Sequence, residues 1–599
     1  MARQPLLITL LVVVALAALV QGWAEFWFLC DDAFITFRYA AMARLGHGYV
    51  WNPPPMPPVE GYTSALWLWL VHGLWVVTGR PPPQTANNLS LVCAGITVGL
   101  TAWATMRAQL SDALAPYRLA VLTLTLGALV THRGFLVWSS SGLETALFVT
   151  LVTGWALAAA REARGPVIGA LAAAIALTRP DGYLVVAATV ALLGLRALRG
   201  EGLRALALGL APLAVVLAHV LWRRLTYGAW LPNTFAAKVG AAWPEAGVPY
   251  LAWFVLEYAL WSWPLALIAA LRRWRPGPGA LIVGLTLLGQ LAYYTLKVGG
   301  DHFEFRVFTH LAPLVALTTP LLFDRAGLRP AWTLALSALA WALASPLPWA
   351  EHLVAKGQTT MVAVRAGPKL ATVLPGPLRP LGVAWDGLRD QLAPQLIGLR
   401  HREHQLFGEL QLRITPGLDA SRPATEGGDV VVVRRVEGGF RLDPTADARP
   451  LLAAAPALDV GTVGVIGWSF PGLLVLDSLG LNDPVIANFG LHVTPRRMAH
   501  ERRPPPGYVE CFKANVTLGV AVEDSATGRL LDVMSTPQGY REGLDLSAPG
   551  LPLPTRWAGK PGLRARAVVL VLERATPLPL ADLARCAAWR PDEGSGPTP

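Results

Sequence analysis

The first 348 residues alternate apolar runs with short polar interruptions, whereas the rest of the chain does not. Runs of this length and composition predict a polytopic α-helical membrane protein, although several are shorter than the ~20 residues that an upright span needs. We interpret the first run as an uncleaved helix, with a cleaved signal peptide as the alternative because Arg3 precedes its apolar core. The twelve runs lie near residues 6–24, 63–78, 88–106, 119–137, 143–160, 165–178, 182–196, 203–222, 250–271, 279–296, 307–323 and 331–348.

Residues 349–590 mix charged, proline-rich and β-like stretches, which is typical of a soluble domain. An amphipathic helix is expected near 351–365, and two β-rich stretches, 429–436 and 567–572, predict a small α/β domain. Between them, the spaced glycines of GVIGWSFPG indicate strand and turn, with Trp468 as a candidate sugar platform. Cys511 and Cys586 can pair if this domain is exported, and two unpaired cysteines are the alternative. Residues 591–599 are expected to be a disordered tail.

The charge pattern orients the predicted helices. Only 15% of the residues are charged and 53% are hydrophobic, and most of the net charge of +11 belongs to the first 350 residues. Arginines occupy every second loop from residue 107 onward, which predicts that these loops face the cytoplasm. The basic excess therefore orients helices and gives no support to a nucleic-acid partner.

The loops between the arginine-rich ones carry the acidic residues and should lie outside. Alternation then places residues 25–62 and the C-terminal domain on the extracytoplasmic face. Twelve full crossings from a cytoplasmic N-terminus would leave the C-terminus inside. We therefore expect segment 63–78 to be re-entrant or incomplete, which gives about eleven crossings.

The first outer loop contains the densest group of candidate catalytic residues. Asp31 and Asp32 follow the first helix, and like-charge repulsion between neighbours raises the pKa of a buried carboxyl and makes it a better base. Acidic residues that merely mark a helix edge are the alternative. Such a pair also fits a divalent cation, although the sequence requires no cofactor. Glu60 adds a third carboxylate to the same surface, and Tyr62 adds an aromatic ring on which a sugar can stack.

Other outer loops add candidate ligands for a sugar or a phosphate. Glu144 and Asp181 stand at expected helix starts, where a favourable interaction with the helix dipole is the alternative role. Asp301 and His302 follow two glycines that free the backbone to approach a ligand, and Asn233 can orient a ligand or close a turn.

The HREH segment looks like a metal pair at first sight. Its histidines, His401 and His404, lack an obvious third ligand, so we interpret them as a solvated helix face.

Several motifs resemble C-type glycosyltransferases (the GT-C superfamily), in particular the group that contains the mycobacterial terminal β-arabinofuranosyltransferase. The first loop carries DDAFITFRYA, GHGYVWNP and VEGYTS, and the later matches keep the family order. They are SGLETALF at 141–148, TRPDG at 178–182, YGAWLPNTFAAKVG at 227–240, KVGGDHFEFR at 297–306, LDSLGLNDPVIA at 476–487 and AHE at 499–501.

The resemblance implies a polytopic transferase, residues 1–348, that takes a sugar from a polyprenyl-phosphate-linked donor. It implies Asp31 or Asp32 as the base and a glycan or glycolipid of the cell envelope as acceptor, held by residues 349–590. The transferred sugar would be a pentofuranose such as arabinose, or a hexose. A lipid phosphate as leaving group needs cations. The outer-face candidates are Arg38, Lys238, Lys297 and Arg306.

Two other functions stay open at this point. A transporter or lipid-linked sugar flippase would need ionisable residues and broken helices near the middle of the membrane. The TRPDG motif, which interrupts two apolar runs, leaves this alternative open. A non-enzymatic envelope protein whose exported domain binds glycan would leave the aspartate pair without a purpose.

Overall fold

The computed structural model describes residues 3–392, apart from 239 and 368, and most of residues 401–590. Outside the description lie 393–400, 415–430, 437–438, 444–456, 461, 472–473, 497, 499–500, 513–515, 536–543, 545, 547–550, 552, 555, 558, 572–578 and 591–599. The expected tail and the first two residues of AHE thus fall outside the described residues.

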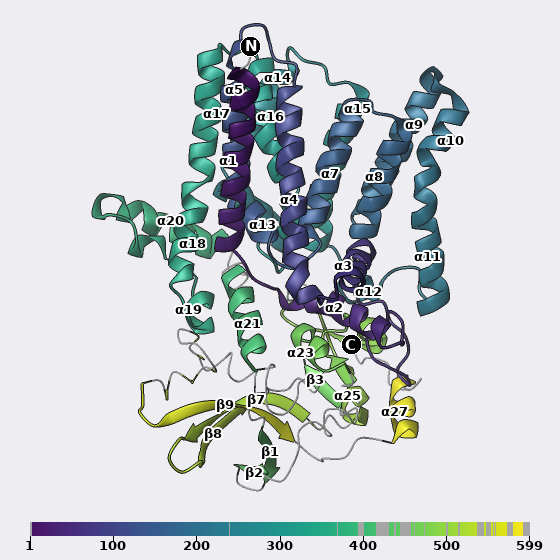
Figure 1. The fold of residues 1–599 in the computed structure, drawn as a ribbon, viewed down its shortest axis with the longest axis vertical. Helices are drawn as coiled ribbons and strands as arrows, with labels where there is room; N and C mark the ends of the chain where they lie inside the picture. The colour runs from purple at the N-terminus through teal and green to yellow at the C-terminus, as the bar shows by residue number, and fades with distance from the viewer. Residues whose placement is uncertain are drawn as a thin grey trace.

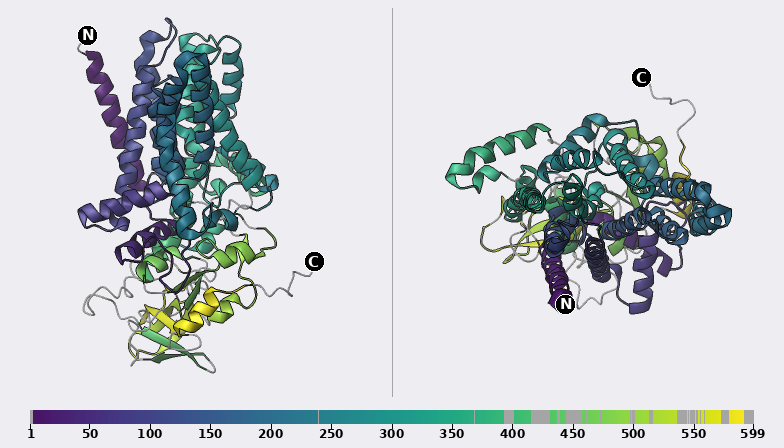
Figure 2. Two further views of the ribbon diagram at one scale, coloured as in Figure 1. Left: turned by 90° about the vertical axis from the view of Figure 1, so that its right-hand side faces the viewer. Right: turned by 90° about the horizontal axis from the view of Figure 1, so that it is seen from above.

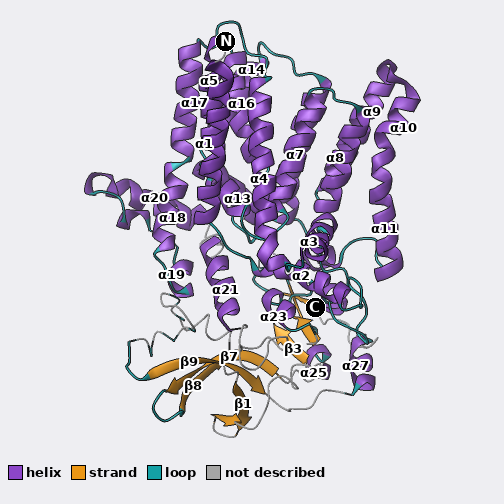
Figure 3. Cartoon of the chain, viewed as in Figure 1, coloured by secondary structure: helices purple, strands orange, loops and turns teal. Residues whose placement is uncertain are grey.

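The apolar runs fold into a bundle of helices that lie along the long axis of the molecule (Figures 1 and 3). The bundle helices are α1 (Arg3–Glu25), α4 (Pro82–Met106), α5 (Arg118–Val130), α6 (Arg133–Trp138), α7 (Thr145–Ala160), α8 (Gly165–Thr178), α9 (Gly182–Arg196), α10 (Gly202–Leu210), α11 (Ala214–Tyr227), α14 (Ser262–Leu271), α15 (Pro278–Ala292), α16 (Leu311–Arg325) and α17 (Pro330–Ala344). Helices α2 (Asp31–Arg44), α3 (Ala65–Thr78), α12 (Asn233–Lys238) and α13 (Pro244–Glu257) lie between them in the chain.

In the described part of the chain, five helices are long and apolar enough to cross a membrane. A sixth arises if α13 and α14, bent by 83° at a short break, count as one span. One of the five, Gly182–Tyr227, doubles back at Gly200 and Gly202, whose φ angles are 116° and 82°. Four further apolar helices have 10–17 residues. The helical membrane class is therefore confirmed, whereas about eleven crossings stays a prediction.

The two ends of the bundle differ in charge. The N-terminus and the arginine-rich loops, such as the one between α9 and α10, lie at one end, and the C-terminal domain lies at the other (Figure 1). Helix α3, from the segment predicted to cross incompletely, lies across the long axis at the end with the C-terminal domain (Figure 2). The acidic outer loops of the sequence therefore share one end with the C-terminal domain.

The C-terminal domain is α/β, with its sheet farthest from the bundle (Figure 3). Five strands in the order β2-β1-β9-β7-β8 form this sheet, in which β1 pairs in parallel with β9 and the other neighbours are antiparallel. Two smaller pairs are β3-β4, parallel, and β5-β6, antiparallel. The strands are β1 (Val431–Val436), β2 (Gly439–Asp443), β3 (Ala457–Val460), β4 (Leu474–Asp477), β5 (Leu491–His492), β6 (Arg502–Arg503), β7 (Val516–Asp524), β8 (Leu530–Ser535) and β9 (Leu563–Val571).

Short helices complete the domain and correct one expectation. They are α18 (Pro346–Lys356), α19 (Met361–Arg365), α20 (Arg379–Leu392), α21 (His401–Ile414), α23 (Gly464–Ser469), α24 (Pro484–Phe489), α25 (Tyr508–Phe512) and α27 (Leu580–Ala587). The first six residues of GVIGWSFPG form helix α23 (Gly464–Ser469), so the strand interpretation was wrong for them. Cys511 and Cys586 form a disulfide that joins α25 to α27, which matches the paired alternative.

The first loop and the C-terminal domain share one hydrophobic core. Buried side chains of both regions contact one another, including Tyr39 and Trp51 from the loop and Ile466, Phe470 and Val475 from the domain. Polar contacts follow the same seam: the Trp51 indole donates to the Val475 carbonyl at 3.0 Å. This seam places the domain directly against α2, the helix that begins with the two aspartates.

Candidate active site

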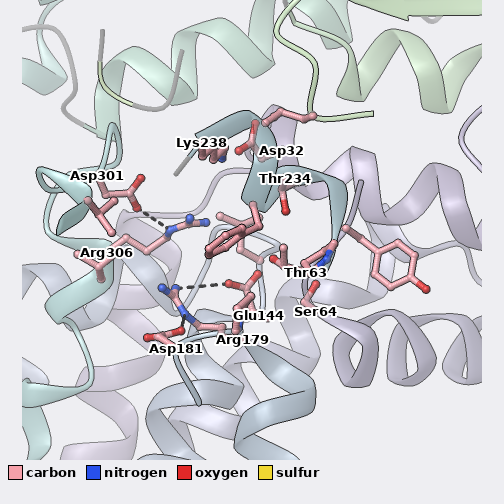
Figure 4. A pocket seen from close by; sticks show the side chains of 18 of the residues that line it. Asp32, Thr63, Ser64, Glu144, Arg179, Asp181, Thr234, Lys238, Asp301 and Arg306 are labelled. Carbon is pink, nitrogen blue, oxygen red and sulfur yellow. Dashed lines mark hydrogen bonds and ion pairs between the residues drawn. The ribbon is translucent and has the colours of Figure 1, made fainter. Parts of the chain in front are cut away.

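A cavity of about 200 Å³ opens where the bundle meets α2 and the C-terminal domain (Figure 4). Its walls come from α2, the chain before α3, the ends of α7, α8 and α15, α12, and the loop 299–306, with Leu481 and Met498 from the C-terminal domain. The charged side chains that line it are Asp32, Glu144, Arg179, Asp181, Lys238, Asp301 and Arg306. Seven charged groups in one small cavity at a helix-bundle end indicate a ligand site for a polar or anionic group.

The two adjacent aspartates face different parts of the molecule. Asp32 lines the cavity, whereas the Asp31 carboxylate accepts hydrogen bonds from the backbone N–H groups of Gly464 and Val465, at 3.1 and 2.8 Å. Of the two candidates for the base, therefore, only Asp32 reaches the cavity. This geometry favours Asp32 over Asp31 as the candidate base.

The pKa values of the pair move in opposite directions. Burial raises the pKa of Asp31 to about 7, more than the backbone N–H donors lower it, and the Asp32 charge raises it further. Burial would also raise the pKa of Asp32, but nearby His302, Lys238 and Arg306 outweigh it and lower that pKa below its ordinary value. Repulsion between the two carboxylates thus raises the pKa of Asp31, which lies outside the cavity, whereas Asp32 is ionised at neutral pH.

The loop 299–306 supports Asp32 from the side. The His302 Nε2 lies 3.8 Å from the Asp32 carboxylate, and the His302 Nδ1 lies 3.0 Å from an Asp301 oxygen. Arg306 donates from Nε to the other Asp301 oxygen at 3.1 Å, which helps to keep the pKa of Asp301 below its usual range despite burial. Hydrogen bonds orient His302, Asp301 and Arg306 relative to one another, and Asp32 lies at ion-pair distance from the imidazole.

Gly299 and Gly300 make this loop possible. Their φ angles are 88° and 101°, which side-chain-bearing residues rarely adopt, and a Cβ on Gly300 would lie 2.8 Å from the Tyr250 ring. The close approach that the sequence suggested is thus at least partly to a buried aromatic ring, while Gly300 also lines the cavity.

The opposite wall is built around Arg179. Its guanidinium donates to Asp181 at 3.0 Å and to the Tyr294 hydroxyl at 2.7 Å, and Glu144 lies 3.6 Å away. Glu144 and Asp181 were expected here, but Arg179 was missed, although it stands inside the TRPDG motif. The signal was a charged residue between two apolar helices, which is costly unless it is paired.

Lys238 is the remaining cation of the cavity. Within the part of the chain that the structure describes, its ammonium makes no hydrogen bond or ion pair, and its charge acts on Asp32 and Asp301. Figure 4 shows Lys238 beside Asp32, on the same side of the cavity as Arg306. Thr36, Thr63, Ser64 and Thr234 add hydroxyl groups that sequence reasoning did not single out, since isolated hydroxyls give no pattern.

Comparison with known proteins gives two partial likenesses in fold. No family model matches the chain, and no curated protein matches it. ArnT from Cupriavidus metallidurans, bound to undecaprenyl phosphate, gives a TM-score of 0.49 at 14% identity over 80% of this chain and 87% of its own. The arabinosyltransferase EmbB from Mycobacterium smegmatis gives 0.33 at 14% identity over 94% of this chain and 62% of its own.

At such identities and scores, the function of this chain has to be inferred from its own residues. The aspartate, the paired arginines and the lysine of the cavity supply that basis.

Four candidate residues lie away from the cavity walls. Glu60 is buried in an ion pair with Arg223, and Asn233 donates to the Gly480 and Leu481 carbonyls at 2.8 and 3.0 Å. Lys297 donates to the Gly240 carbonyl at 2.8 Å and lies outside the cavity lining. In the structure, these three side chains make contacts that join segments of the chain.

Arg38, the fourth of these, was expected to bind phosphate. It is fully buried and donates to the carbonyls of Trp51, Gly467 and Phe470 and to the Asn52 side chain. A guanidinium with this set of partners is committed to the seam with the C-terminal domain. By contrast, Tyr62 does line the cavity, with its hydroxyl 3.3 Å from that of Tyr227.

The remaining sequence candidates are structural. His401 is buried against Phe26 and Phe28 and His404 packs on Phe303, so the solvated-face interpretation was wrong. Burial lowers the pKa of His404 to about 4, which keeps it neutral. Trp468 packs on Phe37 and Trp75 and does not line the cavity. Among the described residues, no three His, Cys, Asp or Glu side chains group as metal ligands would.

Proposed function

We propose that the chain is a membrane glycosyltransferase that moves a sugar from a polyprenyl-phosphate-linked donor to a cell-envelope glycan or glycolipid. The observation that carries the proposal is that the ionised Asp32 lines one cavity together with Arg306 and Lys238. Glycosyl transfer from a lipid phosphate needs both a base for the acceptor and cations for the leaving group. The motif resemblance points to the same class of enzyme.

The reaction can be written from these groups. The acceptor hydroxyl attacks the anomeric carbon and gives its proton to the Asp32 carboxylate, while the bond from the anomeric carbon to the phosphate oxygen breaks. The electron pair of that bond leaves with the lipid phosphate, whose added negative charge Arg306 and Lys238 stabilise. A carboxylate next to the anomeric centre also favours the positive charge that develops there.

The support around Asp32 gives this base a defined position. The His302 Nε2 lies 3.8 Å from the Asp32 carboxylate, within ion-pair distance, and Asp301 orients the imidazole. The lowered pKa of Asp32 makes it a weaker base but guarantees the ionised form over the physiological range. The lower basicity of Asp32 is offset by its position in the cavity, because the carboxylate and the acceptor hydroxyl are held together there and do not have to meet by diffusion.

The substrates are proposed from the cavity and the motifs together. Carboxylates and hydroxyls on the Arg179 wall suit sugar hydroxyl groups, and the apolar bundle suits a lipid tail. We propose a pentofuranose such as arabinose as the transferred sugar, with a hexose as the alternative. The C-terminal domain, which contributes Leu481 and Met498 to the cavity, is proposed to hold the acceptor on the extracytoplasmic face of a bacterial inner membrane.

A transporter or flippase is less well supported by this site. That function requires ionisable groups that become accessible from both sides of the membrane in turn. The charged residues of the cavity instead lie at the bundle end that carries the C-terminal domain, opposite the N-terminus (Figures 1 and 4). One assay separates the two functions, because a flippase moves the donor without cleaving it.

The deciding experiment compares Asp32→Asn with the unchanged protein in nanodiscs, using synthetic polyprenyl-phosphate sugars as donors. We expect the variant to bind donor normally and to lose transfer by roughly 10²–10⁴-fold, the usual contribution of a general base. Gly99→Ala, on a bundle helix where a Cβ would meet nothing within 4 Å, is the matched control. Undiminished transfer by Asp32→Asn would remove the base and with it this mechanism.

The side of the C-terminal domain needs its own test. Single cysteines at Thr527, in an exposed turn of the domain, and at Leu198, 87% exposed near the arginine-rich bend, should label from opposite sides of intact cells. The native cysteines are either buried or joined in the disulfide. Labelling of Thr527→Cys from the cytoplasm alone would contradict an extracytoplasmic domain.

A further inference from the structure

Helix α2 presents one face to the cavity and another to the C-terminal domain. Asp32, Ile35 and Thr36 line the cavity, at the i, i+3 and i+4 spacing of one helix face. Asp31 and Arg38, seven residues apart and so on a common face, both contact α23 of the domain instead. The residue that performs the proposed chemistry is therefore the direct neighbour of one that touches the domain.

The contact between α2 and α23 involves both ends of α23. The Asp31 carboxylate accepts from the first N–H groups of α23, those of Gly464 and Val465, and Arg38 donates to the Gly467 and Phe470 carbonyls at its other end. A negative group at the start of a helix and a positive group at its end both match the helix dipole. Two charged side chains of α2 thus form hydrogen bonds with both ends of one short helix of the domain.

Two glycines allow α23 to lie directly on α2. A Cβ on Gly464 would lie 1.8 Å from the Asp31 carbonyl oxygen, and a Cβ on Gly467 would lie 2.9 Å from both the Arg38 side chain and the Trp51 ring. Backbone meets backbone here, so the position of α23 fixes that of the first turn of α2. Asp31 and Arg38 are both buried, which makes loss of either partner costly.

A second contact holds the same loop from its other end. The Tyr39 hydroxyl bonds to the Asn482 side chain at 3.1 Å, and the Gly61 N–H donates to that hydroxyl at 2.8 Å. Asn52 bonds to the Val475 backbone through both its amide nitrogen and its oxygen, at 3.0 and 3.1 Å. The domain therefore supports the whole of the first loop and not α23 alone.

We propose that the C-terminal domain is an integral part of the active site, in which Asp31 and Arg38 are positioning residues that lock α2 onto α23 and so aim Asp32 into the cavity. This inference rests on the proposed function and goes beyond it, because it assigns the domain a role in the chemical step in addition to acceptor binding. Side chains that hold the lipid phosphate come from other elements, so the lock should affect turnover and leave donor binding nearly intact.

The test uses the full-length protein with Asp31→Ala, Arg38→Met, the double variant and the conservative Asp31→Asn. For each single loss we expect kcat to fall by about tenfold to a hundredfold with donor KM within about twofold, because a small misplacement of a reacting group costs that much. The double variant should be no worse than the more severe single one, since either loss frees the same helix. Asp31→Asn keeps one acceptor oxygen and should recover part of the rate.

A variant that keeps both charged side chains tests the lock without removing a buried charge. Gly467→Ala should displace α23 and lower kcat in the same manner, whereas Gly99→Ala should not; thermal unfolding in detergent confirms that each protein is folded. Wild-type kcat in Asp31→Ala and Gly467→Ala, alongside an inactive Asp32→Asn, would overturn the lock and leave the proposed function standing. Full activity of Asp32→Asn would instead overturn the proposed function itself.

Discussion

The two walls of the cavity use the same residue types in different proportions. On the wall formed by α7, α8 and α9, a single cation, Arg179, lies between two carboxylates, Glu144 and Asp181. On the wall formed by α12 and the loop 299–306, two cations, Arg306 and Lys238, accompany one carboxylate besides the base. The first wall is suited to hydroxyl groups and the second to an anion, so under the proposed function the sugar and the leaving phosphate would have separate places.

The two arginines also differ in how firmly they are held. Arg179 has two carboxylates and the Tyr294 hydroxyl as partners, whereas Arg306 has Asp301 and the face of Phe303, 4.4 Å from the guanidinium. An arginine whose donors are already taken orients its neighbours, while one with donors to spare can bind an incoming phosphate. This difference can be tested by making the same substitution at both arginines and comparing the kinetic effects.

The largest effect is expected for Arg306→Gln. Loss of the cation proposed to bind the leaving phosphate should lower kcat/KM by roughly 10²–10³-fold, because a preorganised charge no longer stabilises the developing negative charge. Arg306→Lys keeps the charge and should retain more activity. Steady-state transfer assays with varied donor concentration measure both. Equal losses in Arg306→Gln and Arg179→Gln, with identical splits between kcat and KM, would erase the distinction between the walls.

Lys238→Met should have the next largest effect, about tenfold in donor affinity. Its ammonium is a point charge without a bonded partner among the described residues, so its removal takes away attraction without unpairing another group. Lys297→Met serves as the comparison, since Lys297 donates to a backbone carbonyl outside the cavity. Titration of donor into nanodiscs, read as a dissociation constant, distinguishes them. Equal losses of donor affinity in the two variants would contradict a specific role for the Lys238 ammonium in donor binding.

A smaller effect is expected on the hydroxyl-binding wall. Glu144→Gln keeps the shape of the side chain but weakens its hydrogen bonds, and should change the preference between donor sugars by about tenfold. The measurement is the ratio of kcat/KM for a pentofuranosyl and a hexosyl donor in the variant and the unchanged protein. A ratio that stays constant while both rates fall together would mean that Glu144 supports Arg179 only.

How far the sequence predicted this site depends on what each residue contacts. The apolar runs, the arginine-rich loops and the strands β1 and β9 follow from local pattern, because burial and membrane exposure act on every residue of a segment. Asp32, Glu144, Asp181, Lys238, Asp301 and Arg306 were found because polar residues at one bundle end are few. The sequence could not separate Asp32 from Asp31, since their difference depends on α23, more than 400 residues later in the chain.

The same reason explains the residues that were misassigned. Arg38 and Glu60 carry charges in an outer loop and resemble ligands by type, but each has buried partners far away in sequence. His401 looked solvated because its own helix is amphipathic, while the rings that cover it, Phe26 and Phe28, come from the first loop just after α1. Long-range pairing decides whether a charged residue serves structure or chemistry, and no local pattern records it.

The smallest expected effect is an acidic limb in the pH profile that belongs to Asp31 and not to the base. The pKa of Asp32 is lowered, so the base stays ionised, whereas burial raises the pKa of Asp31 to about 7. The charged groups that face Asp31 are Asp32 on its own helix and Asp477 at the end of β4, and both favour the neutral form.

As the pH falls through 7, Asp31 gains a proton and loses one acceptor for the α23 N–H groups. We expect kcat to fall severalfold between pH 8 and pH 6, and this limb to be absent in Asp31→Asn, in which the side chain does not titrate. A limb that persists unchanged in Asp31→Asn would assign it to another group and separate the titration of Asp31 from the alignment of Asp32.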